Sequence, residues 1–312
     1  MSTLTLTLIY RYGGLTLLTL GSVSSILNLL VFTSNTLRKN PCAICFIAMS
    51  IIDLLYLYLS LLLTIIQNGF NINIGSTNLV FCRSFYYLGL ILSILGPTYL
   101  IVASIDRTLV TSRNAVTRRK STRRLAIMCL ISLALFWTLF QIHALIYIKI
   151  IEIAPEYFIC YFQPGAYTVF ITYYSLFGVG ILPPLLMTIF GFLTVKNIRQ
   201  VHRPINHSHS STLNTMTVGR SFTVHSKDRQ LIRMLIVEII IYLIARFPST
   251  IVLIYDQITV NQIKSADRIS TEQFIANLTY FIGFIDSSVA CYTNMIVSKN
   301  FRAELKRIFK CR

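Results

Sequence analysis

LVFCRSFYYLGLILSILGPTYLIVASIDRT, residues 79–108, is the stretch that decides the fold of this chain. Between residues 84 and 105 it contains no charged side chain, and then Asp106 and Arg107 stand side by side. A helix rises about 1.5 Å per residue, so the roughly 24 residues from Cys82 to Asp106 cover about 36 Å. The hydrocarbon core of a bilayer is about 30 Å thick. We therefore predict a membrane-spanning helix with a charged pair where it leaves the membrane.

The composition of the whole chain is that of a membrane protein. Of its 312 residues, 54% are hydrophobic and only 12% are charged, and the mean hydropathy is +0.67. These values lie far outside the range of an ordinary soluble domain. Runs long enough to cross a bilayer lie near residues 12–33, 42–66, 79–105, 125–148, 166–195, 231–255 and 271–297. We predict an all-α membrane protein, a seven-transmembrane helix bundle that forms one domain over residues 1–312.

The positions of the basic residues predict the orientation of the chain in the membrane. The formal net charge is +17, and most Lys and Arg lie between spans one and two, three and four, and five and six, and after span seven. The opposite side carries few, namely Arg11, Arg83, Lys149, Lys264 and Arg268. By the positive-inside rule the N-terminus is extracellular and the C-terminus cytoplasmic, in a multi-pass protein of the plasma membrane. The excess charge thus indicates topology and attraction to anionic lipid, and no nucleic-acid partner.

The connection between spans five and six, residues 199–228, is rich in Ser, Thr and His. Two interpretations stand open for it. In the first, its hydroxyls are phosphorylated by a kinase and arrestin binds at the same loop. In the second, it is a solvated linker. No acidic or cysteine partners surround its histidines, so we expect no metal there.

The C-terminal segment is predicted to be a short amphipathic helix over residues 298–310. Apolar residues recur there at helical spacing while Lys and Arg take the other positions, which is typical of a helix lying on a membrane surface. Cys311 at its end is either a palmitoylation site or a free thiol.

The placement of the cysteines predicts one disulfide. Cys82 opens span three and Cys160 lies in the loop after span four, both on the oxidising outer side. The other cysteines within the spans have a packing role by default. A Cys82–Cys160 bond would hold that loop over the mouth of the bundle.

A second acid is placed to meet the charged pair of span three. Asp228 begins the cytoplasmic end of span six, about 30 Å of helix before Pro248, so it can approach Arg107 if helices three and six pack together. Breaking such a partly desolvated contact would couple an outward movement of helix six to a signal. We therefore predict that Asp106, Arg107 and Asp228 act together.

In their order and spacing, these residues resemble the rhodopsin-like family of G-protein-coupled receptors over nearly the whole chain. The matching residues are Asp53, Cys82, Cys160, Asp106, Arg107, Trp137, Pro183, Pro184, Pro248 and the ending SKNFRAELKRIF. The fragment LRKNPC at 37–42 is similar to invertebrate FMRFamide-type neuropeptide receptors and related orphans. The resemblance implies an extracellular ligand, most simply a neuropeptide, and a heterotrimeric G protein as partner. An orphan chemosensory receptor for a small molecule is the alternative.

The chain also departs from the pattern of this family. The span-one Asn of the family falls at Ser25, with Asn28 one turn later as a substitute, and Thr108 replaces the third residue of Asp-Arg-Tyr. Arg246 stands two residues before the span-six proline, in place of an aromatic residue. In span seven, the Asn-Pro-x-x-Tyr motif is replaced, with Ala290, Cys291 and Asn294 at its positions. These changes affect the activation relay and the sodium pocket of the family.

Arg246 requires a partner because an unpaired arginine within a span costs upward of about 3 kcal/mol. Asp286 in span seven is the first candidate, and Asp53 in span two is the second. The alternative is that Arg246 extends into a wet cavity. Glu238, also in span six, has no obvious cationic partner.

For the ligand, the resemblance implies a site in the outer half of the bundle, with Tyr86, Tyr87, Gln141, Tyr173, Tyr174 and Arg246 as candidate lining residues. Aminergic members of the family carry an acid in span three, but this chain has Gly89 there, which disfavours an amine. Span seven has no lysine before Lys299, so a retinal Schiff base is disfavoured and no cofactor is expected.

No nucleophile–base pair or metal-ligand cluster stands out, so we do not expect an enzyme. An ion transporter or channel is the rival class, because Asp53, Glu238, Arg246 and Asp286 would serve an ion path. The odd number of spans and the outer cysteine pair argue against it. A third possibility is a receptor-shaped protein with reduced coupling.

Overall fold

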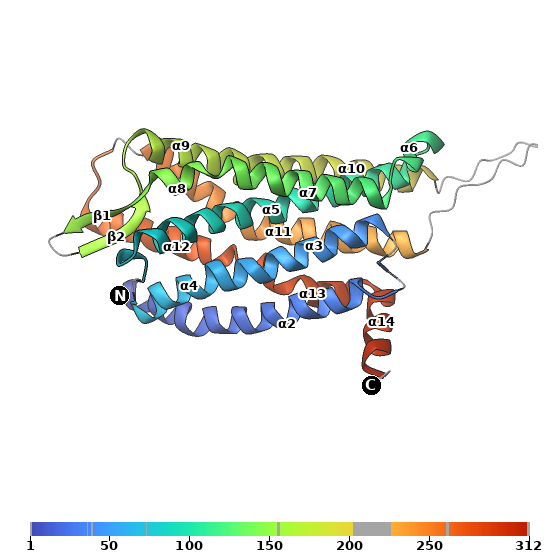
Figure 1. The fold of residues 1–312 in the computed structure, drawn as a ribbon, viewed down its shortest axis with the longest axis horizontal. Coiled ribbons are helices and arrows are strands. Elements are labelled where there is room, and N and C mark those ends of the chain that lie inside the picture. Colours follow the sequence, from blue (N-terminus) through green and yellow to red (C-terminus); the bar gives the residue numbers. More distant parts are fainter. Residues whose placement is uncertain are drawn as a thin grey trace, which may run out of the picture.

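The computed structural model describes residues 2–35, 37–38, 40–72, 74–154, 157–201, 226–259 and 262–310. Within these residues, seven helices are long and apolar enough to cross a membrane. They lie side by side along the long axis of the molecule (Figure 1). Their bounds are Leu4–Phe32, Pro41–Gly69, Leu79–Thr111, Arg123–Tyr147, Ala166–Gln200, Asp228–Thr259 and Ala266–Val297. The predicted seven-helix membrane bundle is confirmed.

Several of these spans are built from more than one helical segment. The first three are α1 (Ser2–Leu8), a π-helical turn (Ile9–Gly13) and α2 (Gly14–Phe32); then α3 (Pro41–Tyr56), α4 (Leu62–Thr64) and the π-helical turns Leu57–Leu61 and Ile65–Gly69; then α5 (Leu79–Thr111). The fourth and fifth are α7 (Arg123–Phe140) with α8 (His143–Tyr147), and α9 (Ala166–Tyr174), a π-helical stretch (Ser175–Ile181) and α10 (Leu182–Val201). The last two are α11 (Ser226–Thr259), and α12 (Ala266–Ile282) with α13 (Ile285–Val297). Outside the spans lie a 3-10 turn (Ile74–Ser76), α6 (Ala115–Arg119) and α14 (Lys299–Lys310).

Side-chain caps begin several helices. The Asn78 side chain accepts hydrogen bonds from the backbone N–H groups of Val80 and Phe81 at the start of α5, at 2.9 and 3.2 Å. The side chains of Asn40, Asn114, Thr122 and Ser265 cap α3, α6, α7 and α12 in the same way. Such caps satisfy backbone donors that have no partner inside the helix. The polar residues that flank the apolar runs therefore set where these helices begin.

Several helix bounds differ from the sequence prediction, and two of these differences involve charged residues. The first span begins about eight residues earlier than position 12, with Arg11 inside it. This charge is tolerated because the Arg11 Nε donates to the Gly69 carbonyl at 2.9 Å and the guanidinium stacks over the Phe70 ring at 4.9 Å. The third span continues past residue 105 to Thr111, so Asp106 and Arg107 lie within the helix.

The connection after the fourth span contains a β-hairpin that the all-α prediction did not include. Strands β1 (Ile148–Ala154) and β2 (Tyr157–Phe162) pair antiparallel, with Ile150 opposite Cys160. Isoleucines recur along β1, and β-branched residues favour strands. The hairpin lies at one end of the bundle (Figure 1), which we call the disulfide end, and the opposite end, with α6 and α14, is the basic end.

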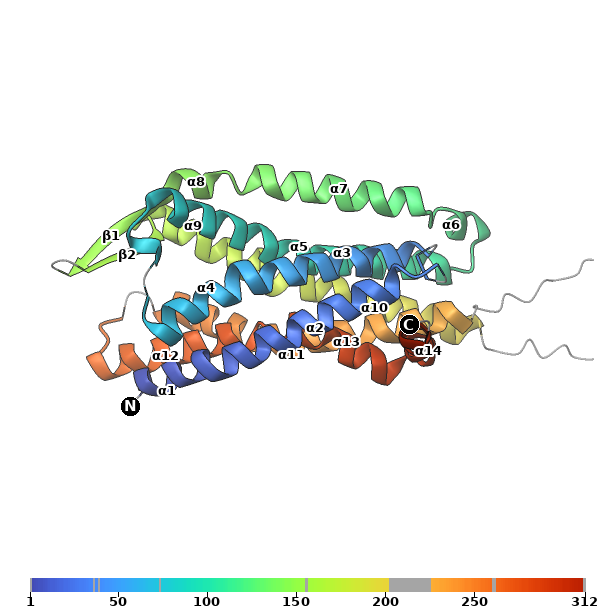
Figure 2. The ribbon, with the colours of Figure 1, turned by 60° about the horizontal axis from the view of Figure 1, so that its bottom comes forward.

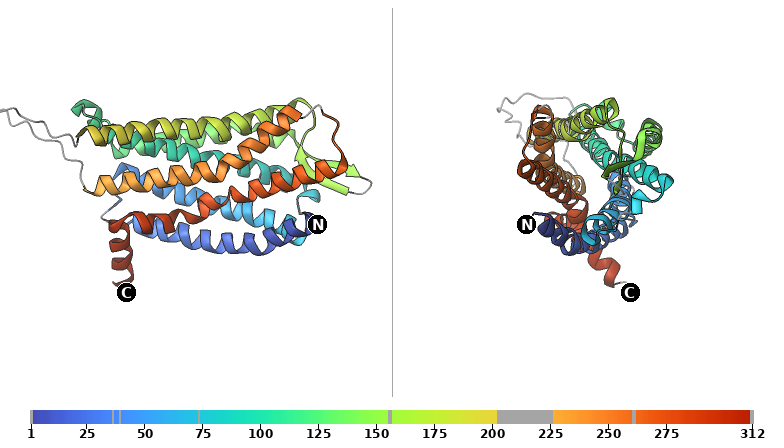
Figure 3. Two further views of the ribbon diagram at one scale, coloured as in Figure 1. Left: turned by 180° about the vertical axis from the view of Figure 1, so that it is seen from behind. Right: turned by 90° about the vertical axis from the view of Figure 1, so that its left-hand side faces the viewer.

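The α14 helix leaves the basic end of the bundle at a steep angle to the spans instead of continuing along them (Figures 2 and 3). Phe301 is buried, and its ring meets the ring of Phe32 at 5.7 Å. Phe32 in turn stacks on Phe46 at 4.9 Å. This aromatic stack ties α14 to α2 and α3, while most of the basic side chains of α14 remain on its surface. The predicted amphipathic C-terminal helix is therefore present.

Candidate functional site

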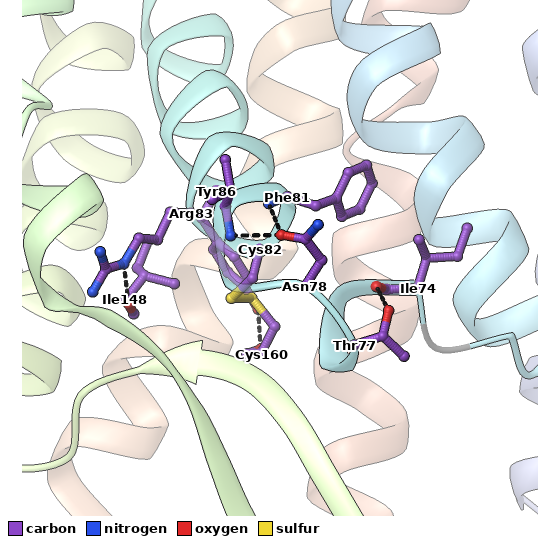
Figure 4. Close-up of a disulfide and its surroundings, with 10 residues drawn as sticks. Ile74, Thr77, Asn78, Phe81, Cys82, Arg83, Tyr86, Ile148 and Cys160 are labelled. Carbon is purple, nitrogen blue, oxygen red and sulfur yellow. Dashed lines mark hydrogen bonds between the residues drawn. A yellow bond between two sulfur atoms is a disulfide. The ribbon is translucent and has the colours of Figure 1, made fainter.

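At the disulfide end, Cys82 and Cys160 form the predicted disulfide, with their Cα atoms 5.7 Å apart. Two hydrogen bonds join the same helix and hairpin (Figure 4). The Tyr86 hydroxyl donates to the Cys160 carbonyl, and the Arg83 Nε donates to the Ile148 carbonyl, each at 3.1 Å. The hairpin is thus fixed to α5 at three points.

Inside the bundle, a cavity with several ionisable side chains in its wall lies between α3, α5, α11 and α13. Its ionisable lining consists of Asp53 from α3, Glu238 and Arg246 from α11, and Asp286 from α13, together with two tyrosines. We call the space that these side chains line the polar cavity. Burial of so many ionisable groups is costly in a membrane and is typical of a functional site.

Within the polar cavity, Arg246 pairs with Asp286, the first candidate from the sequence. The Arg246 Nε lies 3.5 Å from the Asp286 Oδ2, and the two side chains are only 13% and 15% exposed. The guanidinium also lies 5.9 Å from the ring centres of both Tyr56 and Tyr242. A carboxylate and two aromatic faces therefore compensate the buried cation.

The partner of Arg246 sits beside a break in the seventh span. Helix α12 ends at Ile282 and α13 begins at Ile285, with Gly283 between them. A Cβ atom added to Gly283 would lie 3.2 Å from an Arg246 Nη1. A residue without a side chain at this break therefore lets the guanidinium approach the backbone of the seventh span.

Glu238, in the wall of the same cavity, is held by the side-chain amide of Asn294, which also reaches Asn28. The Asn294 Nδ2 donates to the Glu238 Oε1 at 3.1 Å and lies 3.4 Å from the Asn28 Oδ1. These three side chains are buried, and they join α11, α13 and α2. Asn28, one turn after Ser25, thus contacts Asn294 of the seventh span.

In the altered span-seven motif, a hydrogen bond joins the seventh span to the first. The backbone N–H of Cys291, which stands where the family has proline, donates to the Ser24 hydroxyl at 2.9 Å. This bond joins α13 to α2 through groups that the sequence did not single out.

At the basic end, Arg107 is fully buried among acceptors. Its Nη2 lies 2.5 Å from the Asp106 Oδ2, and its Nη1 lies 3.0 Å from the Asp228 Oδ1. The Asp106 Oδ1 also accepts from the Ser121 hydroxyl at 2.5 Å. The predicted meeting of Asp106, Arg107 and Asp228 is present, and we call these three residues the lock.

Asn40 also touches the lock and was not predicted from the sequence. Its Oδ1 accepts from the Arg107 Nη2 at 2.9 Å. The signal that was available is the Asn-Pro pair at 40–41, which marks a helix N-terminus and hence the basic end of α3. That signal locates Asn40 along the chain, but it does not reveal the contact with α5.

The predicted ligand residues do not form one pocket. The Tyr87 hydroxyl donates to the Thr138 carbonyl at 3.0 Å, and the buried Gln141 donates to the Tyr174 hydroxyl. Tyr173 is 47% exposed and lies on the outside of the bundle against Phe177. Tyr86 lines a smaller cavity next to Cys160. Of the predicted set, Arg246 alone lines the polar cavity.

Two predicted features lie outside the described residues. They are Cys311 and most of the 199–228 connection, of which residues 202–225 are not described.

Comparison with known proteins places the chain in a family. No curated protein matches it. The model of the family described as 7 transmembrane receptor (rhodopsin family) matches residues 25–290, which is most of the chain and includes the lock, the polar cavity and both disulfide cysteines. With this match and its seven membrane-length helices, the chain belongs to the rhodopsin family of seven-transmembrane receptors.

Proposed function

We propose that this receptor converts the binding of an extracellular neuropeptide into activation of a heterotrimeric G protein. In this proposal the protein lies in the plasma membrane. The disulfide end and the N-terminus face the outside of the cell, and the basic end faces the cytoplasm. The concentration of Lys and Arg at the basic end supports this orientation.

The observation that carries the proposal is the complete burial of Arg107 between the third and sixth spans. Its ion pair with Asp228 joins two separate helices, and Asp228 is 22% exposed while Arg107 is not exposed at all. A buried charge that loses one partner is strongly destabilised. Separation of α11 from α5 therefore needs a compensating event, such as insertion of a G protein at the basic end.

Helix α11 connects this lock to the polar cavity. Asp228 and Arg246 belong to one uninterrupted helix, and the roughly 18 residues between them correspond to about 27 Å. A ligand that moves Arg246 relative to Asp286 would therefore move the helix that carries Asp228. The polar cavity is the element that senses the ligand, and the lock is the element that responds.

A peptide ligand is supported by the geometry of the disulfide end. In the described chain the sheet has two strands, so each strand has one edge without a strand partner. An extended peptide can pair with such an edge through its backbone. The similarity of residues 37–42 to FMRFamide-type receptors favours the same class of ligand. The alternative is a chemosensory receptor, in which a small molecule would bind in the polar cavity directly.

Other partners follow from the surface of the basic end. The helix α14, with its buried Phe301 and exposed cations, is suited to anionic lipid, and palmitoylation of Cys311 would strengthen that attachment. A kinase and arrestin would act at the 199–228 connection, where phosphate would stand among arginines.

A peptide-library screen on cells that express the receptor with a panel of G proteins tests the proposal. We expect at least one amidated or free peptide to give a signal that Arg107→Ala abolishes while surface expression is kept. Ligand-evoked ion flux that persists without any G protein would contradict it and favour a transporter or channel, for which the four ionisable side chains of the polar cavity would serve as the path.

A further inference from the structure

Asn40 uses both polar atoms of its side chain at the basic end. Its Nδ2 donates to the Asp228 Oδ1 at 2.9 Å, and its Oδ1 accepts from the Arg107 Nη2 at 2.9 Å. The same Oδ1 accepts from the backbone N–H of Cys42 at 3.1 Å and so caps α3. One amide thus touches the second, third and sixth spans together.

We propose that Asn40 is a positioning residue of the lock, which holds α11 to α3 as well as to α5. The atom that decides this is the Asp228 Oδ1, because it accepts from both the Arg107 Nη1 at 3.0 Å and the Asn40 Nδ2 at 2.9 Å. Each pair among Asn40, Arg107 and Asp228 is in direct contact, so the three side chains form a closed triangle. Movement of α11 breaks two bonds at one oxygen simultaneously.

A second contact on the opposite face of α11 completes this attachment. The Gln230 Oε1 accepts from the Ser298 hydroxyl at 3.0 Å and from the Asn300 backbone N–H at 2.8 Å. At about 100° per residue, side chains two positions apart in a helix point to nearly opposite sides. Asp228 therefore holds α11 to α3 and α5, while Gln230 holds it to the junction of α13 and α14.

The chemistry of the triangle requires an amide at position 40. Arg107 needs an acceptor there, whereas Asp228, as a carboxylate, needs a donor. Aspartate at position 40 would keep the bond to Arg107 and the cap on α3, but it would set two carboxylates against each other. The Asn40→Asp variant therefore disrupts only the contact between position 40 and Asp228 of α11.

The signalling consequence of this inference rests on the proposed function, but the contact itself is measurable without any G protein. Spin labels on introduced keto amino acids at the exposed positions 124 and 233 report the distance between α7 and α11 at the basic end in the purified full-length receptor. The variants are Asn40→Asp, Asp228→Asn and the double exchange. The control is Asn114→Asp, the same change at the cap of α6, whose side chain bonds Val116 on its own helix.

We expect Asn40→Asp to raise the fraction of long distances about fivefold, which corresponds to the loss of one net hydrogen bond of about 1 kcal/mol. Asp228→Asn also removes the ion pair with Arg107 and should raise this fraction further. The exchange variant should be less open than either single variant, because the amide then carried by α11 would donate to the carboxylate then carried by α3. Recovery should be partial, because an amide nitrogen at the place of the Asp228 Oδ1 cannot also accept from Arg107. Asn114→Asp should leave the distribution unchanged.

An unmodified distribution in Asn40→Asp, or an exchange variant as open as either single variant, would overturn the inference. If Asn40→Asp does not fold, Asn40→Ser keeps a capping hydroxyl on α3 but is too short to bridge both partners, and it should open the bundle in the same way. Opening without any change in ligand-independent signalling would count against the proposed function and leave the positioning role of Asn40 standing.

Discussion

The Arg246 Nε and the Asp286 Oδ2 lie 3.5 Å apart and join the sixth and seventh spans next to the break at Gly283. Neither side chain is more than 15% exposed. Removal of one partner from such a pair leaves a buried charge without compensation, whereas removal of both does not. The interaction is therefore open to a test by exchange.

We expect Arg246→Asp and Asp286→Arg each to lower the stability of the receptor by about 3 kcal/mol or more, and to reduce its surface expression, because each leaves two like charges facing in the cavity. The double exchange should recover most of both. Thermal denaturation of the purified protein and surface labelling of cells measure the effect. A double variant that is no more stable than the less stable single variant would show that Arg246 and Asp286 do not stabilise the receptor as a pair.

Glu238 is expected to tolerate glutamine but not leucine. Glu238→Gln keeps an oxygen that accepts from the Asn294 amide, now 3.1 Å from the Glu238 Oε1, and it removes a buried acid. Glu238→Leu leaves the Asn294 amide with one partner fewer, at a cost of about 1 to 3 kcal/mol. Chemical denaturation of the three proteins compares them, and equal loss in both variants would argue against this role of the carboxyl oxygen.

Loss of the disulfide should detach the hairpin from α5. A bond that closes a loop over a sequence separation of 78 contributes about 2 to 4 kcal/mol. We expect Cys82→Ser to reduce both thermal stability and surface expression, and a reducing agent to reproduce the loss of stability in the unmodified receptor. Cys129→Ser removes a partly buried free thiol and is the control, with little change expected.

Gly283→Ala should disturb Arg246. The added Cβ would lie 3.1 Å from the Tyr280 carbonyl oxygen and 3.2 Å from the Arg246 Nη1, closer than side chains ordinarily approach. We expect a loss of about 1 to 3 kcal/mol from this overpacking. Gly96→Ala is the matched control: a Cβ there meets nothing within 4 Å, so it should be neutral or stabilise α5 by up to about 1 kcal/mol. Equal melting temperatures for the two variants would contradict this prediction.

The features that sequence predicted well are those in which a single physical requirement acts along the chain. Apolar runs long enough for a bilayer gave the seven spans, and the oxidising side of the membrane left Cys82 and Cys160 as partners. The high cost of an unpaired arginine in a span pointed from Arg246 to Asp286.

The features that were missed depend on how separate helices are rotated and staggered. The contacts of Asn40 require the start of α3 to lie beside Arg107 of α5, which no local pattern records. Tyr173 belongs to an aromatic-rich stretch, but its side of α9 faces outward. The bounds of the first span were misjudged because the carbonyl that satisfies Arg11 comes from Gly69, far along the chain.

The pairing of Arg246 with Asp286 has a consequence for how the bundle depends on its surroundings. A dissolved cation beside a buried carboxylate exchanges with the medium, and its occupancy follows the ionic composition on that side of the membrane. Arg246 is a counter-ion that the polypeptide itself supplies, at a fixed stoichiometry of one per molecule. The position of its guanidinium is set by the sixth helix and not by the ions in the medium. The positive charge next to Asp286 therefore changes only when that helix moves.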